Sequence, residues 1–102
     1  MRTGSLDVNT DITVNRTSSL ANQPNPFSGT TAIRYTYPST AKQAFINVTD
    51  LNGNRIKRFD LRANGGNSLS LTFDGSVNAG TYIYNLEVDG KVVESKKLVY
   101  VK

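Results

Sequence analysis

The feature that most restricts the fold of this chain is a series of short stretches in which hydrophobic and polar side chains alternate. Turn-forming Gly, Pro and Asn residues separate these stretches, at the spacing of about 8 to 12 residues that is typical of all-β sandwiches. No stretch keeps the helical period of 3.6 residues. We therefore predict an all-β fold, an antiparallel Ig-like β-sandwich of about seven strands.

The expected strands cover residues 32–37, 42–49, 55–61, 69–73, 80–88 and 91–101. Ile56 is out of phase with Phe59 and Leu61, so we expect a β-bulge near Lys57 and Arg58, because an extra residue restores the phase of a half-buried strand. The final strand carries apolar residues at both its odd and its even positions, so both of its faces are partly apolar. This pattern predicts either that other elements cover both faces or that one apolar face is available to a partner.

Size and charge limit the class of protein. A chain of 102 residues has room for one domain with one core. Its net charge of +4 comes from scattered cations, the densest being Arg55 to Arg58 and Lys96-Lys97. Since phosphate binding needs cations that converge on one face, we interpret these as solvated or edge-protecting charges and expect no nucleic-acid partner. No apolar run is long enough for a membrane span, and no signal peptide follows Met1.

The residue types exclude most catalytic chemistry. Cys and His are both absent, which removes thiolate and imidazole ligands and the usual nucleophile pairs. Asp50 and Asp74 lie at predicted turns, where an aspartate ordinarily accepts hydrogen bonds from its own backbone; a calcium site there is the alternative. Among the tyrosines, Tyr100 is the candidate for an exposed aromatic ring on which a sugar could stack. We predict no enzyme activity, no cofactor and no metal site.

The beginning of the chain divides into two short segments. Residues 1–5 have the composition of an expression scar, and residues 6–19 are predicted to form a linker, although the pattern of Val8, Ile12 and Val14 also fits an added edge strand. The domain proper is expected to cover residues 20–102.

Two prolines mark the entrance to this domain. Pro24 and Pro26 remove two amide donors and force their neighbours to be extended. Such a segment cannot lie in the middle of a sheet. We therefore expect it at the edge of the fold, with Phe27 closing the open end of the core.

Three motifs together resemble the type A C-terminal sorting domain of cargo proteins of the type IX secretion system, the Por secretion tail family. One is the Pro24 to Phe27 stretch, followed by residues 31–35. Another is the turn from Asp50 to Gly53, with the basic residues Arg55 and Lys57 after it. The last is the pair of strands from Gly80 to Lys102. The motif residues are Pro24, Asn25, Pro26, Phe27, Asp50, Gly53, Gly80, Tyr82, Tyr84, Leu86 and Gly90.

The resemblance implies an Ig-like domain that is not catalytic and acts as an address for an attached upstream cargo. In this family the outer-membrane translocon and a shuttle protein recognise the domain after the cargo has reached the periplasm of a Gram-negative cell. A surface sortase then cleaves ahead of the domain, and the cargo is released or joined to lipopolysaccharide. The resemblance thus implies transit through the periplasm, a final place at the cell surface or outside the cell, and a cut within residues 6–21.

The terminal strand suggests a mechanism of recognition. A strand with free backbone groups can pair with a receptor by β-augmentation. Our hypothesis is that apolar side chains contact the translocon while lysines set charge and register. The residues concerned are Lys96, Lys97, Leu98, Val99, Tyr100, Val101 and Lys102. The plainer alternative is that these residues only complete the sheet.

Two other functions fit the same fold. A carbohydrate-binding or adhesive sandwich module would need an exposed aromatic platform or a calcium site. A structural spacer would predict further protein after Lys102 in the parent gene, whereas the sorting interpretation predicts a stop codon there.

Overall fold

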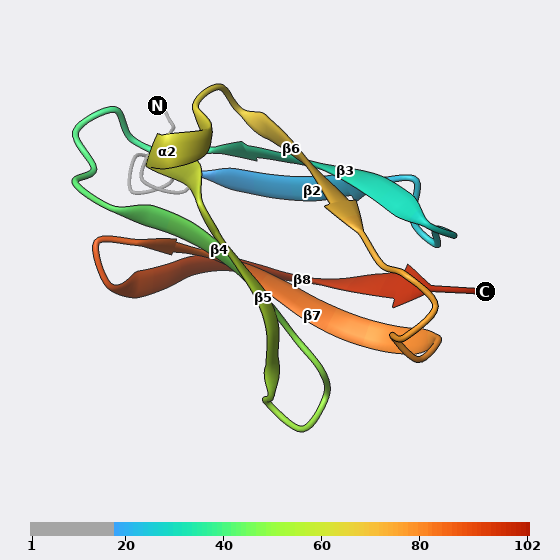
Figure 1. Ribbon diagram of the computed structural model, residues 1–102. Coiled ribbons are helices and arrows are strands. Elements are labelled where there is room, and N and C mark those ends of the chain that lie inside the picture. Colours follow the sequence, from blue (N-terminus) through green and yellow to red (C-terminus); the bar gives the residue numbers. More distant parts are fainter. Residues whose placement is uncertain (1–17) are drawn as a thin grey trace, which may run out of the picture.

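The computed structural model describes residues 18–102, which form two antiparallel sheets packed face to face (Figure 1). One sheet has the order β2-β3-β6 and the other the order β5-β4-β7-β8. The strands are β2 (Ser19–Gln23), β3 (Thr30–Thr36), β4 (Ala44–Thr49), β5 (Arg55–Asp60), β6 (Ser68–Thr72), β7 (Gly80–Val88) and β8 (Lys91–Tyr100). The predicted all-β, Ig-like sandwich is confirmed. The predictions for residues 1–5 and for Val8, Ile12 and Val14 lie outside the described residues.

The core lies between the sheets and follows the predicted alternation. On β4 the inward side chains of Ala44, Ile46 and Val48 are fully buried, and the equivalent positions of β3, β6 and β7 are buried too. Alternate residues of a strand point to opposite faces, so each strand contributes one apolar row. The larger core side chains are Leu20, Phe27, Ile33, Tyr35, Ile46, Leu61, Leu69, Leu71, Phe73, Tyr82, Tyr84, Leu86, Leu98 and Tyr100.

The hairpin between β7 and β8 turns at Asp89 and Gly90, as the sequence predicts. Both have positive φ angles, 49° and 86°, the combination of a type I′ turn that matches strand twist. The Asp89 carboxylate also accepts hydrogen bonds from the backbone N–H groups of Lys42 and Gln43, at 2.8 and 2.9 Å. The turn is therefore tied to the loop that precedes β4.

Two elements differ from the sequence prediction. The sequence pattern did not predict β2: its first residue, Ser19, ends the expected linker, and its other residues lie at the start of the expected domain. Leu20 is its buried side chain, at 3% exposure. The strand expected up to Leu61 ends at Asp60, and a single helical turn follows, α2 (Leu61–Asn64). Asp60 caps this turn by accepting hydrogen bonds from the N–H groups of Arg62 and Ala63.

Bulges interrupt both edge strands of the four-stranded sheet. In β5, Val48 faces Lys57 and Thr49 faces Arg55, so Ile56 is the extra residue, one position before the predicted site. In β8, Leu86 faces Glu94 and Glu87 faces Val92, so Val93 is extra. This second bulge changes the phase of the strand. It explains why apolar residues occur at both odd and even positions of β8: before the bulge Val92 and Val93 are exposed, and after it Leu98 and Tyr100 are buried.

Phe27 closes one end of the core, as expected. Its side chain is 2% exposed, and its ring centroid lies 5.6 Å from that of Phe73 and 5.4 Å from that of Tyr100. Phe73 and Tyr100 pack edge to face at 5.0 Å, a favourable aromatic arrangement. The three rings join the entrance segment, the loop that begins directly after β6, and the terminal strand.

This packing predicts the effect of truncating Phe27. Phe27→Ala should lower the free energy of unfolding by about 3–5 kcal/mol, because it removes a buried ring and leaves a cavity. Urea denaturation followed by circular dichroism measures the change. Leu51→Ala is the matched control: Leu51 is 65% exposed, so its truncation should change the free energy by less than about 0.5 kcal/mol. Equal effects of the two substitutions would contradict the packing.

Candidate functional site

The candidate site is the terminal strand together with the segment that covers part of it. β8 is an edge strand, and one of its sides pairs with β7. We call its other side the outer edge. The Val99 N–H donates to Asn25 Oδ1 at 2.9 Å, and Asn25 Nδ2 donates to the Lys97 carbonyl at 3.2 Å. Further along, the Phe27 N–H donates to the Val99 carbonyl and the Val101 N–H to the Phe27 carbonyl, both at 2.9 Å.

The two prolines explain why a side chain takes part in this pairing. Pro24 and Pro26, each preceded by a cis peptide bond, have no N–H to offer to a neighbouring strand. The amide side chain of Asn25 has both a donor and an acceptor, and it uses them in place of backbone groups. Phe27 has its own N–H, and there the pairing continues as a parallel bridge with Tyr100. The segment from Asn25 to Phe27 thus acts as a short additional strand.

A buried network holds the start of this segment. The Tyr84 hydroxyl donates to Asn22 Oδ1 at 2.8 Å, and Asn22 Nδ2 donates to Thr31 Oγ1 at 3.1 Å. The Thr31 hydroxyl in turn donates to the Pro24 carbonyl at 2.8 Å. Tyr84 and Thr31 are each 1% exposed. Burial raises the pKa of Tyr84 to about 12, because the charged phenolate is disfavoured away from water.

The residues proposed for recognition fall into two groups. Leu98 and Tyr100 belong to the core, with exposures of 0% and 4%. Val99 is half-buried, and the exposed members are Lys96, Lys97, Val101 and Lys102. The Tyr100 hydroxyl donates to the Asp74 carbonyl at 3.2 Å inside the fold. Tyr100 therefore offers no exposed ring to a sugar.

The remaining motif residues build turns and core. Asp50 Oδ1 accepts hydrogen bonds from the N–H groups of Asn52 and Asn54, each at 2.9 Å. These bonds, chiefly that from Asn54, hold the pKa of Asp50 below its usual value. Gly53 has a φ of 92° in this turn. The structure brings the Pro24 to Phe27 stretch and the terminal strand together, whereas the turn at Asp50 follows β4, on the far side of β7.

Gly80, Tyr82 and Leu86 lie on β7, and Gly90 lies in the turn after it. Asp74, the other candidate for calcium, accepts hydrogen bonds from the N–H and hydroxyl of Ser76. These bonds, the hydroxyl one foremost, lower the pKa of Asp74. Within residues 18–102 no three Asp or Glu side chains gather at a possible metal site.

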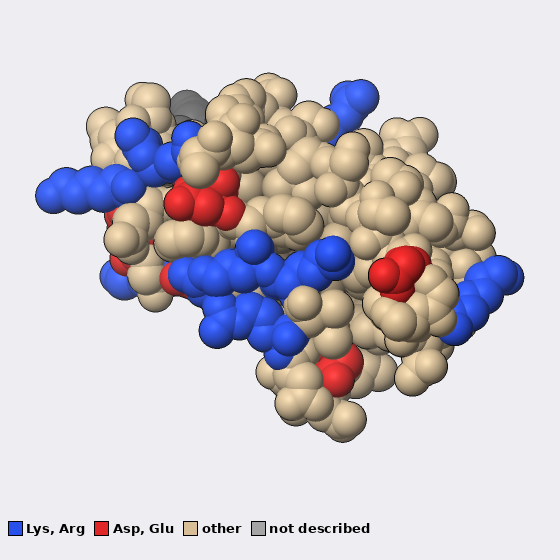
Figure 2. All heavy atoms as spheres, in the orientation of Figure 1, with Lys and Arg blue, Asp and Glu red and all other residues tan. Residues whose placement is uncertain are grey.

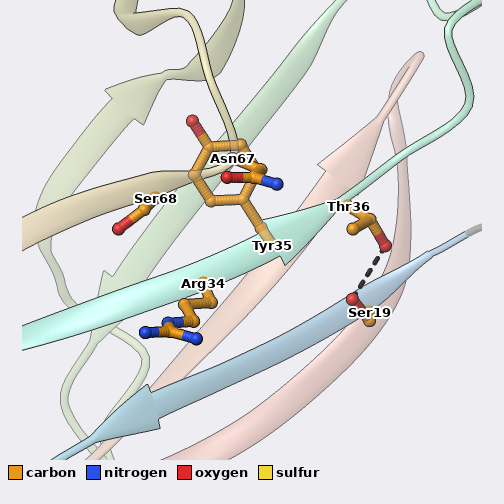
Figure 3. A pocket seen from close by; sticks show the side chains of 6 residues that line it. All are labelled: Ser19, Arg34, Tyr35, Thr36, Asn67 and Ser68. Atoms are coloured by element: carbon orange, nitrogen blue, oxygen red, sulfur yellow. Dashed lines mark hydrogen bonds between the residues drawn. The ribbon is translucent and has the colours of Figure 1, made fainter.

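A depression on the three-stranded sheet offers no clear ligand site. It is lined by Ser19, Arg34, Tyr35, Thr36, Asn67 and Ser68 (Figure 3). Tyr35 is 1% exposed, and its hydroxyl donates to the Gly65 carbonyl at 3.2 Å. Ser19 and Thr36 share a hydrogen bond of 2.7 Å. The aromatic ring is therefore part of the core and forms no platform for a sugar.

A shallow polar depression lies on the outer face of the four-stranded sheet. Asn47, 7% exposed, donates to Asn85 Oδ1 and to Glu87 Oε1. It accepts from Arg58, whose guanidinium carbon lies 3.9 Å from the centre of the Phe45 ring. Arg58 also approaches Glu87 at 3.6 Å. These polar groups satisfy one another.

Exposed cations lie along both edge strands of the four-stranded sheet, and Arg34 is exposed on the central strand of the other sheet. Figure 2 shows Lys and Arg side chains gathered where β5 crosses the front of the molecule, and Arg55, Lys57 and Arg58 of that strand are exposed. β8, at the opposite edge, carries Lys96 and Lys97. Charges at these positions discourage pairing between sheets. None of the helical segments in the described region has the length and apolarity of a membrane span.

Comparisons with known proteins place the chain in context. Residues 23–102 match the model of a family described as the secretion system C-terminal sorting domain. The fold resembles part of the crystal structure of dimeric latent PorU from Porphyromonas gingivalis, with a TM-score of 0.61 and 16% identity. That match covers 82% of this chain but only 9% of the PorU chain, so it shows a shared fold. No curated protein matches the sequence.

The buried phenol of Tyr84 predicts a pH dependence of stability. In the unfolded chain a tyrosine loses its proton near pH 10, whereas folded Tyr84 holds its proton up to about pH 12. Between these values the unfolded state binds fewer protons, so the free energy of unfolding should fall as the pH rises. Denaturant titrations at several pH values measure this loss. Tyr84→Phe should reduce it, and an unchanged slope in that variant would contradict the assignment.

Proposed function

Because this chain belongs to the secretion system C-terminal sorting domain family, we propose that it directs an attached cargo across the outer membrane by type IX secretion. In this role the domain is an address and performs no catalysis. The cargo precedes it in the chain, passes through the periplasm, and ends at the cell surface or outside the cell.

The observation that carries this proposal is the pairing of the Asn25–Phe27 segment with the terminal strand. The matched region begins at Gln23, just before this segment, and reaches Lys102. Its two ends are held together by four hydrogen bonds between residues 25–27 and 97–101. The family motifs therefore describe one closed folded unit, in which the terminal strand has a fixed position. A receptor needs such a fixed position to read side chains reliably.

We propose that the translocon and its shuttle protein recognise the exposed side of the terminal strand. Lys96, Lys97, Val101 and Lys102 are exposed and Val99 is partly so, and these provide charge and apolar contact area. Leu98 and Tyr100, which also belong to the proposed recognition strand, act by anchoring it in the core. Electrostatic complementarity of this kind favours specificity and the rate of encounter.

The place of β2 bears on the cleavage step. β2 begins at Ser19, so a cut by the surface sortase in the part of residues 6–21 that precedes Ser19 leaves every described strand intact. The released domain would then keep its fold, while the cargo is freed or joined to lipopolysaccharide.

A deletion of residues 96–102 does not test recognition cleanly. It removes Leu98 and Tyr100 from the core, and the loss of two large buried side chains costs about as much as the whole stability of a small domain. We expect that truncated chain to be unfolded by circular dichroism. Surface substitutions are needed to separate signal from core.

The sharper prediction concerns charge reversal on the terminal strand. A reporter carrying this chain should be exported by a type IX-competent cell, and Lys96→Glu with Lys97→Glu should lower export roughly tenfold, the factor that corresponds to about 1.4 kcal/mol of lost interaction. Immunoblots of surface and periplasmic fractions measure export. Arg55→Glu with Lys57→Glu changes the net charge equally on β5, the opposite edge strand of the same sheet, and should export normally. Normal export of the terminal variant, with its fold intact, would exclude recognition through these lysines.

A further inference from the structure

The outer edge of β8 is only partly covered. Backbone groups alternate in direction along a strand, and those of Val99 point away from β7, so those of Lys97 and Ser95 do as well. Among residues 18–102, no group bonds to the N–H or carbonyl of Ser95, or to the N–H of Lys97. We call the stretch from Ser95 to Val99 the open edge. The bulge at Val93 limits the open edge at one end and the backbone of Phe27 limits it at the other, while β2, which pairs with β3, also lies close to β8.

The two residues that cover the outer edge are held very differently. Phe27 is anchored by its buried ring and pairs through its backbone. Asn25 is exposed and pairs only through its side-chain amide, with the Lys97 carbonyl and the Val99 N–H. A side-chain amide can rotate away without disturbing the core. The Asn25 contacts can therefore be exchanged for those of another chain, whereas the Phe27 contacts stay.

Charge indicates what kind of chain fits the open edge. Lys91, Lys96 and Lys97 are exposed on β8, and Glu94 is the one acidic residue of the strand. Val92 and Val93 are also exposed, at 58% and 41%. An extended segment with acidic side chains and one or two apolar ones complements this surface.

Building on the proposed function, we propose that an extended acidic segment of the secretion receptor adds to the open edge as a further strand of the four-stranded sheet. Its backbone pairs with Ser95 and Lys97 and takes the place of the Asn25 side chain at Val99. Phe27 remains bound and fixes where the added strand must end. The receptor then recognises the domain both by the register in which its added strand pairs with β8 and by contacts with the lysines of β8.

A proline at Ser95 tests this pairing. Ser95→Pro removes the outward N–H that the added strand would use, at an edge position where no group within residues 18–102 bonds to that N–H. Export of the reporter should fall at least tenfold, while circular dichroism and the unfolding midpoint show a folded domain. Ser95→Thr keeps the N–H and should export normally. A folded Ser95→Pro variant exported at the level of the unsubstituted chain would overturn the proposal.

Hydrogen exchange of the 102-residue chain tests the exchangeable contact without any receptor, and it decides the matter if Ser95→Pro does not fold. The Val99 amide should exchange at least tenfold faster than the Tyr100 amide, after correction for intrinsic rates, because it opens locally. Asn25→Ala should speed Val99 exchange further, roughly tenfold. Asn64→Ala removes side-chain amide hydrogen bonds far from β8 and should not change the ratio of the Val99 and Tyr100 exchange rates. Equal protection of Val99 and Tyr100 would overturn the proposal.

These outcomes separate the two levels of the argument. If the unsubstituted domain fails to export the reporter, the proposed function itself fails. If it exports the reporter and Ser95→Pro does so equally, only strand addition at the open edge fails.

Discussion

The structure depends on how the terminal strand is covered on its outer edge. A strand at the edge of a sheet presents unpaired backbone groups that invite association. Here the segment from Asn25 to Phe27 covers the last part of β8, and the ring of Phe27 packs against Phe73 and Tyr100. One short segment therefore closes the core and fixes the strand. The entrance of the domain and its end, far apart in sequence, hold each other in place.

Under the proposed function, the recognition residues and the core residues share one strand. Leu98 and Tyr100 point into the sandwich, while Lys97 and Val99 lie on the other face. The inward residues hold the outward ones in register, so a receptor that reads the outward ones reads only the folded domain. Such a dependence is useful for an export signal, because a chain that has not folded does not present it. It also explains why truncations at this end mix two effects.

The alternation of apolar residues was sufficient to predict the sandwich and the inward faces of β3, β4, β6 and β7. It was not sufficient for elements whose cause is local capping or distant pairing. α2 has a single turn, too short for any helical period, and only Asp60 before Leu61 hints at it. β2 has one large apolar residue, Leu20, and so lacks a pattern. The bulge at Ile56 was placed one residue too late, because a change of phase locates a bulge only to within a residue or two.

The role of Asn25 illustrates the limit most clearly. Its partners lie 72 and 74 residues away, and no periodicity in a sequence encodes a side chain that replaces a missing backbone group. The need for an amide side chain at position 25 nevertheless follows from the hydrogen-bonding groups that are present once the pairing is known. With prolines on both sides, the segment lacks two N–H groups, and its remaining side chain must both donate to Lys97 and accept from Val99. An aspartate accepts but cannot donate when ionised, and a serine is too short to span two backbone positions, so an amide between the prolines is the side chain that meets both needs.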